Sequence, residues 1–208
     1  MIFFSAIVYF FSVVFGCLSY KYFKNNFSVK VFLFFLIFTD IIEFGLSTLA
    51  CFKMNNHSLI NIYLLGTFIY ITTIVLKQRF KIFKAFFISL ILLLLILILV
   101  NYNLLIANIP LLIIVSSLVI FISGYFILKE SNDDNKSITK NPLFWLNSGL
   151  LIYYFSMLGM LILFNIITSP NHKLITSYFD YFNCSMIAIS NTLYIKGFYA
   201  TRQLNYDH

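Results

Sequence analysis

The stretch VFLFFLIFTDIIEFGLSTLAC, residues Val31–Cys51, decides the fold, because it is long and apolar enough to cross a membrane. A transmembrane helix needs about 20 mostly apolar residues to cross roughly 30 Å of hydrocarbon. The stretch also carries two acids, Asp40 and Glu43, which stand three residues apart and share one helical face with Ser47. It therefore predicts a membrane helix whose acidic face is turned into a helix bundle.

The rest of the chain has the same apolar character. Of its 208 residues, 61% are hydrophobic and only 10% are charged, and the mean hydropathy is +0.94. A water-soluble domain needs a polar surface that such a chain does not have. Seven segments are long and apolar enough to span a membrane: Ile2–Tyr20, Val31–Cys51, Leu59–Leu76, Ile82–Val100, Leu104–Leu128, Pro142–Asn165 and Leu174–Ile195. We therefore expect an all-α protein with one seven-helix transmembrane domain over residues 1–208 and no soluble domain.

The basic residues indicate how these helices are oriented. Twelve of the 14 Lys and Arg residues fall in the first, third and fifth connections or near the C-terminus, and only Lys53 and Lys173 fall on the other side. Lys and Arg are enriched in the cytoplasmic loops of membrane proteins, so we place the N-terminus outside and the C-terminus in the cytoplasm. The net charge of +7 then reflects membrane orientation and anionic lipid head groups, and no nucleic-acid partner is expected.

Three acids lie inside the predicted helices, namely Asp40, Glu43 and Asp180. Each ionised acid costs about 2.5 to 3.5 kcal/mol at the centre of a membrane helix. Counted at 1.5 Å per residue from the predicted outer ends, Glu43 lies about 12 Å deep, Asp180 about 10 Å and Asp40 about 16 Å. If the second and seventh helices are neighbours, the three carboxyl groups form one interior cluster.

No Lys or Arg lies in the interior of a predicted span, so these acids must keep their protons, accept hydrogen bonds, or bind a cation or cationic ligand. Other helices offer polar partners: Asn183 on the seventh, Asn61, Thr67 and Tyr70 on the third, and Asn147, Tyr153, Tyr154 and Ser156 on the sixth. The candidate ligand- or proton-binding residues are Asp40, Glu43, Asp180, Asn183, Asn61, Asn147 and Tyr153. Three interpretations stay open: hydrogen bonds that hold the helices together, a sensing or binding cavity, and a proton or cation pathway.

The same residues argue against an enzyme and against a metal or other cofactor. The three histidines fall in outer turns or at the C-terminus, so no zinc site is expected at membrane depth. Lys196 lies too near the cytoplasmic end of the last helix to form a retinal Schiff base. No phosphate-binding glycine-rich loop occurs in the chain.

A resemblance adds to this reading. The segment Phe144–Ser156 reads FWLNSGLLIYYFS, and the third helix opens with Asn61-Ile62-Tyr63. In these residues the chain resembles a group of uncharacterised small bacterial seven-transmembrane-helix proteins that are often encoded beside sensor histidine kinases. The resemblance covers about a third of the chain. It implies a sensor role, or a partner in the bacterial cytoplasmic (inner) membrane, with no catalytic residue to carry over.

We therefore expect a non-enzymatic membrane sensor or accessory module that acts through a protein partner. The partner is expected at the cytoplasmic face, where the connection Lys129–Asn141 is the longest. The alternative is a small proton- or cation-linked transporter or pore that uses Asp40, Glu43 and Asp180. Such a pore could be a homo-oligomer, and membrane lipid is the other expected partner in either case.

Overall fold

The computed structural model describes residues 3–54, 56–77, 109–131, 137–166 and 172–206. Within these ranges the chain contains α-helices, one short 3-10 helix and no β-strand, which confirms the predicted all-α class. The helices are α1 (Phe4–Phe23), α2 (Phe27–Cys51), α3 (His57–Lys77), α5 (Ile109–Ser131), η1 (Ile138–Lys140), α6 (Pro142–Ile166) and α7 (His172–Tyr206). The predicted fourth span, Ile82–Val100, lies outside the described residues.

Four of these helices are long and apolar enough to cross a membrane, namely α1, α3, α5 and α6. Their lengths of 20 to 25 residues correspond to the roughly 30 Å of a hydrocarbon core. The structure therefore supports a multi-pass membrane protein. Helix α7 is longer, with 35 residues, or about 52 Å at 1.5 Å per residue, so it exceeds the thickness of the hydrocarbon core.

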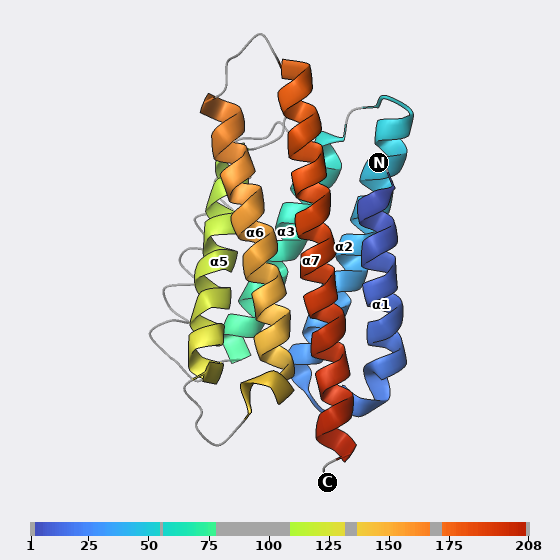
Figure 1. Cartoon of the computed structure of the whole chain (residues 1–208), viewed down its shortest axis with the longest axis vertical. Helices are drawn as coiled ribbons and strands as arrows, with labels where there is room; N and C mark the ends of the chain where they lie inside the picture. Colours follow the sequence, from blue (N-terminus) through green and yellow to red (C-terminus); the bar gives the residue numbers. More distant parts are fainter. Residues whose placement is uncertain (1–2, 55, 78–108, 132–136, 167–171, 207–208) are drawn as a thin grey trace.

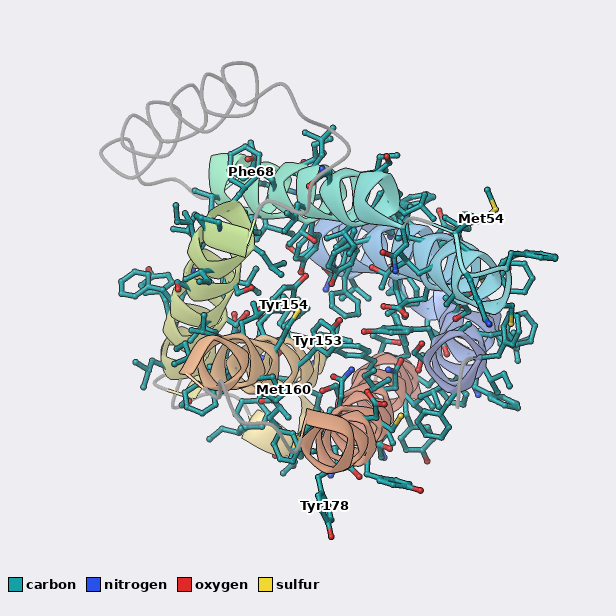
Figure 2. All side chains as sticks on the ribbon, turned by 90° about the horizontal axis from the view of Figure 1, so that it is seen from above. Met54, Phe68, Tyr153, Tyr154, Met160 and Tyr178 are labelled. Atoms are coloured by element: carbon teal, nitrogen blue, oxygen red, sulfur yellow. The ribbon has the colours of Figure 1, made fainter. Side chains whose placement is uncertain are left out.

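The helices form a closed ring in the order α1, α2, α3, α5, α6 and α7, and α7 returns to pack against α1 (Figure 2). Helices α1, α3, α5 and α7 run in one direction, and α2 and α6 run in the other (Figure 1). The C-terminal parts of four helices thus meet at one end of the ring, which carries Lys21, Lys77, Lys129, Lys196 and Arg202. We call this the basic end and the opposite end the distal end.

Large side chains fill the interior of the ring toward the basic end. The Phe32 ring centroid lies 5.0 Å from that of Tyr194 and 6.1 Å from that of Phe198. The Phe198 ring in turn stacks on Phe23, with 5.7 Å between centroids. All four side chains are buried, and aromatic pairs at such distances stabilise a core beyond the burial of their area. We call Phe23, Phe32, Tyr194 and Phe198 the aromatic layer.

Cations of the basic end pack on aromatic rings. The Lys196 ammonium lies 3.6 Å from the Trp145 ring centroid, which ties α7 to the start of α6. The Arg202 Nε atom donates a 3.0 Å hydrogen bond to the Ser19 hydroxyl of α1, and its guanidinium lies 4.7 Å from the Phe15 ring centroid. These contacts extend the packing of α7 against its two neighbours beyond Ile195, where the sequence predicted the end of the last span.

Glycines bring α6 and α7 into close contact. A Cβ atom on Gly149 would collide with the ring of Tyr194 and lie 2.9 Å from the carbonyl oxygen of Ser190. A Cβ atom on Gly197 would lie 2.6 Å from Leu146. Small residues allow this approach in lipid, where helices associate through packing and hydrogen bonds instead of the hydrophobic effect.

The Gly149→Ala variant is expected to be less stable, because the added methyl group has no room against α7. Overpacking of this kind costs about 1 to 3 kcal/mol. Gly159→Ala on the same helix is the matched control, since a Cβ atom there meets nothing within 4 Å and Ala is intrinsically favoured in helices by up to about 1 kcal/mol. Thermal melts followed by circular dichroism in one detergent compare the two. Equal melting temperatures would contradict the close α6–α7 contact.

Candidate functional site

The acid Glu43 lies on α2 and is only partly exposed. Its Oε2 atom accepts a 2.8 Å hydrogen bond from the Ser5 hydroxyl of α1. Asp40, one turn earlier on α2, is also partly buried, and its carboxyl group is close enough to interact electrostatically with that of Glu43. The two acids of the deciding stretch thus lie near one another, and Glu43 is the one bonded to a neighbouring helix.

Tyrosine side chains from three helices lie near Glu43. The Tyr63 hydroxyl of α3 lies 2.7 Å from the Tyr154 hydroxyl of α6, and the ring of Tyr9 on α1 packs edge-on against that of Tyr153, with 6.4 Å between centroids. Figure 2 shows Tyr153 and Tyr154 pointing into the ring from α6. The Glu43 carboxyl group interacts electrostatically with Tyr9, Tyr153 and Tyr154. We call the set Ser5, Tyr9, Glu43, Tyr63, Thr67, Tyr153 and Tyr154 the polar cluster.

Helical spacing explains how the chain builds this set. Ser5 and Tyr9 are four residues apart on α1, and Tyr63 and Thr67 are four apart on α3, so each pair shares one face. Tyr153 and Tyr154 are successive residues and point about 100° apart around α6. One can therefore turn toward α1 while the other turns toward α3.

The hydrogen bonds of the polar cluster have a direction. The Thr67 hydroxyl donates its single proton to the carbonyl oxygen of Tyr63 at 2.9 Å, so in the 3.1 Å contact with Tyr154 it accepts. The Tyr154 proton is then used, and Tyr154 accepts from Tyr63. The chain of donors therefore runs from Tyr63 through Tyr154 to Thr67 and leaves the oxygen lone pairs of Tyr63 at its start.

The polar cluster extends from the distal half of the ring to its middle. Tyr9 is five residues into α1 and Tyr63 is six residues into α3, which places them about 8 and 9 Å from the distal ends of those helices. Phe32 is only five residues from the other end of α2, and Phe23 is the last residue of α1. On the side of the ring formed by α1, α2 and α7, the buried aromatic layer therefore lies between the polar cluster and the basic end.

The predicted cluster of three acids does not form. Helix α1 lies between α2 and α7 in the ring, and Asp180 is exposed on α7. Its neighbour Tyr178 is 70% exposed and points away from the ring in Figure 2. Asp180 does share a face with the buried Ile187, two turns on, but the side chains of α7 are exposed on several faces at this level. The periodicity of the sequence predicts which face of a helix is buried. It does not predict how far along the helix its neighbours cover that face.

The three predicted asparagines take different positions. Asn183 is half-buried beside Asp180, and Asn61 is half-buried on α3, two residues before Tyr63. Asn147 is buried, and its Nδ2 atom donates a 2.7 Å hydrogen bond to the Leu143 carbonyl oxygen of its own helix. Among the predicted site residues, only Glu43 and Tyr153 belong to the polar cluster.

Sequence reasoning missed Ser5, Tyr9 and Tyr63. A signal for the first two exists, because small or polar residues recur every three or four positions along α1, at Ser5, Tyr9, Ser12, Gly16 and Ser19. Ser12, Gly16 and Ser19 are buried. This stripe marks the face of α1 that packs into the ring, and Tyr9 lies on it.

Comparison of the chain with protein families, curated proteins and solved structures finds no match. In the part of the chain that the structure describes, no group of three or more His, Cys, Asp or Glu side chains could hold a metal ion. The function of the polar cluster must therefore be argued from its own hydrogen bonds and charges.

Tyr154→Phe is expected to lower the free energy of unfolding by about 0.6 to 1.7 kcal/mol, the range of hydrogen bonds between membrane helices. The variant keeps the ring but removes the hydroxyl that joins Tyr63 to Thr67. Tyr178→Phe is the matched control, because that side chain is 70% exposed. Denaturation in mixed micelles measures both. A Tyr154→Phe protein as stable as the control would show that the hydroxyl chain does not hold α3 to α6.

Proposed function

We propose that the protein is a seven-helix module of the bacterial cytoplasmic membrane whose polar cluster binds a cationic or proton-donating group, and that it acts through a protein partner at the basic end. The observation that carries this proposal is the division of the interior: on the side of α1, α2 and α7, the buried aromatic layer lies between the polar cluster and the basic end.

The directions of the helices support seven spans. Helix α3 ends at the basic end, whereas α5 begins at the distal end (Figure 1). The chain between them must therefore change sides once, and the apolar run Ile82–Val100 in that interval is long enough to do so. Because Lys and Arg favour the cytoplasmic side, the basic end faces the cytoplasm and the N-terminus lies outside.

The hydrogen-bond donors and acceptors of the polar cluster support a ligand that is cationic or donates a proton. Glu43 brings a carboxyl group that accepts a hydrogen bond from the Ser5 hydroxyl, and the donor chain that starts at Tyr63 offers the lone pairs of that hydroxyl as acceptors. No Lys or Arg belongs to this cluster. A group that completes these acceptors must donate hydrogen bonds or carry positive charge, as an amine, a cation or an acquired proton does.

The aromatic layer favours a sensor over a pathway. A proton or cation that crosses the membrane needs polar groups or water along its whole route. Here the route from the polar cluster to the basic end meets Phe32, Phe198 and Phe23, which are all at most 2% exposed. A change at Glu43 can instead be passed on through the packing of α7, whose Tyr194 belongs to this layer.

The basic end offers the surface for a partner. The residues 137–140, which lead into α6, are all exposed there. They are held in place, since Trp145 Nε1 donates a 2.9 Å hydrogen bond to the Thr139 carbonyl oxygen and Asn141 Nδ2 donates to Glu130. The last turns of α7 extend from the same end (Figure 1).

Glu43→Gln tests the sensor proposal against the transporter alternative. The substitution keeps an oxygen that can accept from Ser5 and removes the ionisable group. In proteoliposomes with a pH-sensitive dye, we expect no proton flux from the wild-type protein. In native membranes, we expect Glu43→Gln to change the amount of a defined protein that co-purifies with the full chain by about threefold or more.

Asp180→Asn is the control, because it removes an exposed carboxyl group and leaves the polar cluster intact. It is expected to behave as the wild-type protein in both assays. Flux that the wild-type protein supports and Glu43→Gln abolishes would replace the sensor proposal with the transporter.

The orientation makes a separate prediction. Cys51 is exposed at the distal end, and Thr139 is exposed at the basic end. In a Cys17→Ala and Cys184→Ala background, a membrane-impermeant maleimide added to intact cells should label Cys51. In the same background with Cys51→Ala, a Thr139→Cys protein should be labelled only after the membrane is opened. The reverse pattern would invert the orientation.

A further inference from the structure

An open pocket of about 580 Å³ lies at the basic end, where the turn from α1 to α2 meets the last residue of α3. Three lysines line it, Lys21, Lys24 and Lys77. Asn25, Asn26 and Ser28 add neutral polar groups, and no acid belongs to the lining. The pocket is far from the polar cluster, which extends from the distal half of the ring to its middle.

Aromatic rings hold two of the lysines at the walls of this pocket. The Lys77 ammonium lies 3.7 Å from the ring centroid of Phe27, which also lines the pocket. The Lys21 ammonium lies 4.8 Å from the ring centroid of Tyr22. Contacts of this type fix the position of a long side chain without neutralising its charge. The positive charges are therefore held at the pocket by partners that leave them available to an anion.

The neutral polar groups of the pocket are also suited to donate hydrogen bonds. The Asn26 Oδ1 atom accepts from the Val29 backbone N–H at 3.3 Å, which leaves the amide protons of Asn26 for another acceptor. The Ser28 hydroxyl and the Asn25 amide add donors on the same turn. Three ammonium groups with amide and hydroxyl donors, and without a carboxylate, match the charge and the oxygen acceptors of a phosphate group.

The volume and the position of the pocket narrow the class of ligand that it can bind. A volume of about 580 Å³ lies in the range of small-molecule sites, and it exceeds what a single inorganic phosphate would fill. The pocket opens at the end of the bundle where basic and aromatic residues gather, which is the level of lipid head groups. We propose that this pocket binds the phosphate of an anionic ligand, and that in the membrane this ligand is the head group of an anionic phospholipid.

Native mass spectrometry of the full chain in detergent tests the proposal, with phosphatidylglycerol as the anionic probe and phosphatidylcholine as the zwitterionic one. The test variant is Lys21→Gln, Lys24→Gln and Lys77→Gln together. The control is Lys129→Gln, Lys140→Gln and Lys196→Gln, which removes the same charge from the same end outside the pocket. We expect the pocket variant to bind phosphatidylglycerol about tenfold more weakly than the control does, and neither variant to change phosphatidylcholine binding.

Competition identifies the source of the phosphate. If millimolar inorganic phosphate displaces phosphatidylglycerol from the wild-type protein, the site takes the phosphate group itself from either source; if it does not, the site needs the lipid. Equal losses in the two variants, or a wild-type protein that binds both lipids alike, would overturn the proposal. Replacing the three lysines by Arg should keep binding, which separates lost charge from lost folding. These readouts do not involve Glu43, so they stand or fall independently of the sensor function.

Discussion

A hydroxyl or carboxyl group in a bundle surrounded by lipid can find its hydrogen-bond partner only on its own helix or on a neighbouring one. Glu43 accepts a hydrogen bond from Ser5 on α1, and Tyr154 is hydrogen-bonded to Tyr63 and Thr67 on α3. These bonds tie α2 to α1 and α6 to α3 in a medium where apolar side chains gain little by leaving lipid for one another. The order of the ring depends on them, together with the glycine contacts that seat α7 on α6.

The two halves of the interior are built for different purposes. Toward the basic end, the rings of Phe23, Phe32 and Phe198 pack against one another, and the ring of Tyr194 packs against Phe32. Toward the distal end, the hydroxyl chain can reverse or break when one proton is added or removed, because each hydroxyl both donates and accepts. Under the proposed sensor function, a change at Glu43 would reach the hydroxyl chain first and the aromatic layer second.

The sequence predicts the described helices well, and four of them, α1, α3, α5 and α6, are long and apolar enough to cross a membrane; the predicted span Ile82–Val100 lies outside the described residues. It predicts the end of the last helix less well: Lys196 and Arg202 suggest a cytoplasmic boundary, yet Trp145 and Ser19 hold them against the bundle and the helix continues to Tyr206. Glu43 and Tyr153 could be identified from their chemistry alone. The exposure of Asp180 could not be predicted from the sequence. It depends on which part of α7 the other helices cover, and therefore on contacts between segments that are distant in the chain.

The length and continuity of α7 have a mechanical consequence. Within its 35 residues it contains no proline, and its single glycine, Gly197, is occupied by the close contact with Leu146, so the usual sites of bending are absent. A helix that is held at Tyr194 and continues as one stiff rod to Tyr206 transmits a tilt or rotation along its whole length. A small change at Tyr194 would therefore displace its last turns by a larger amount.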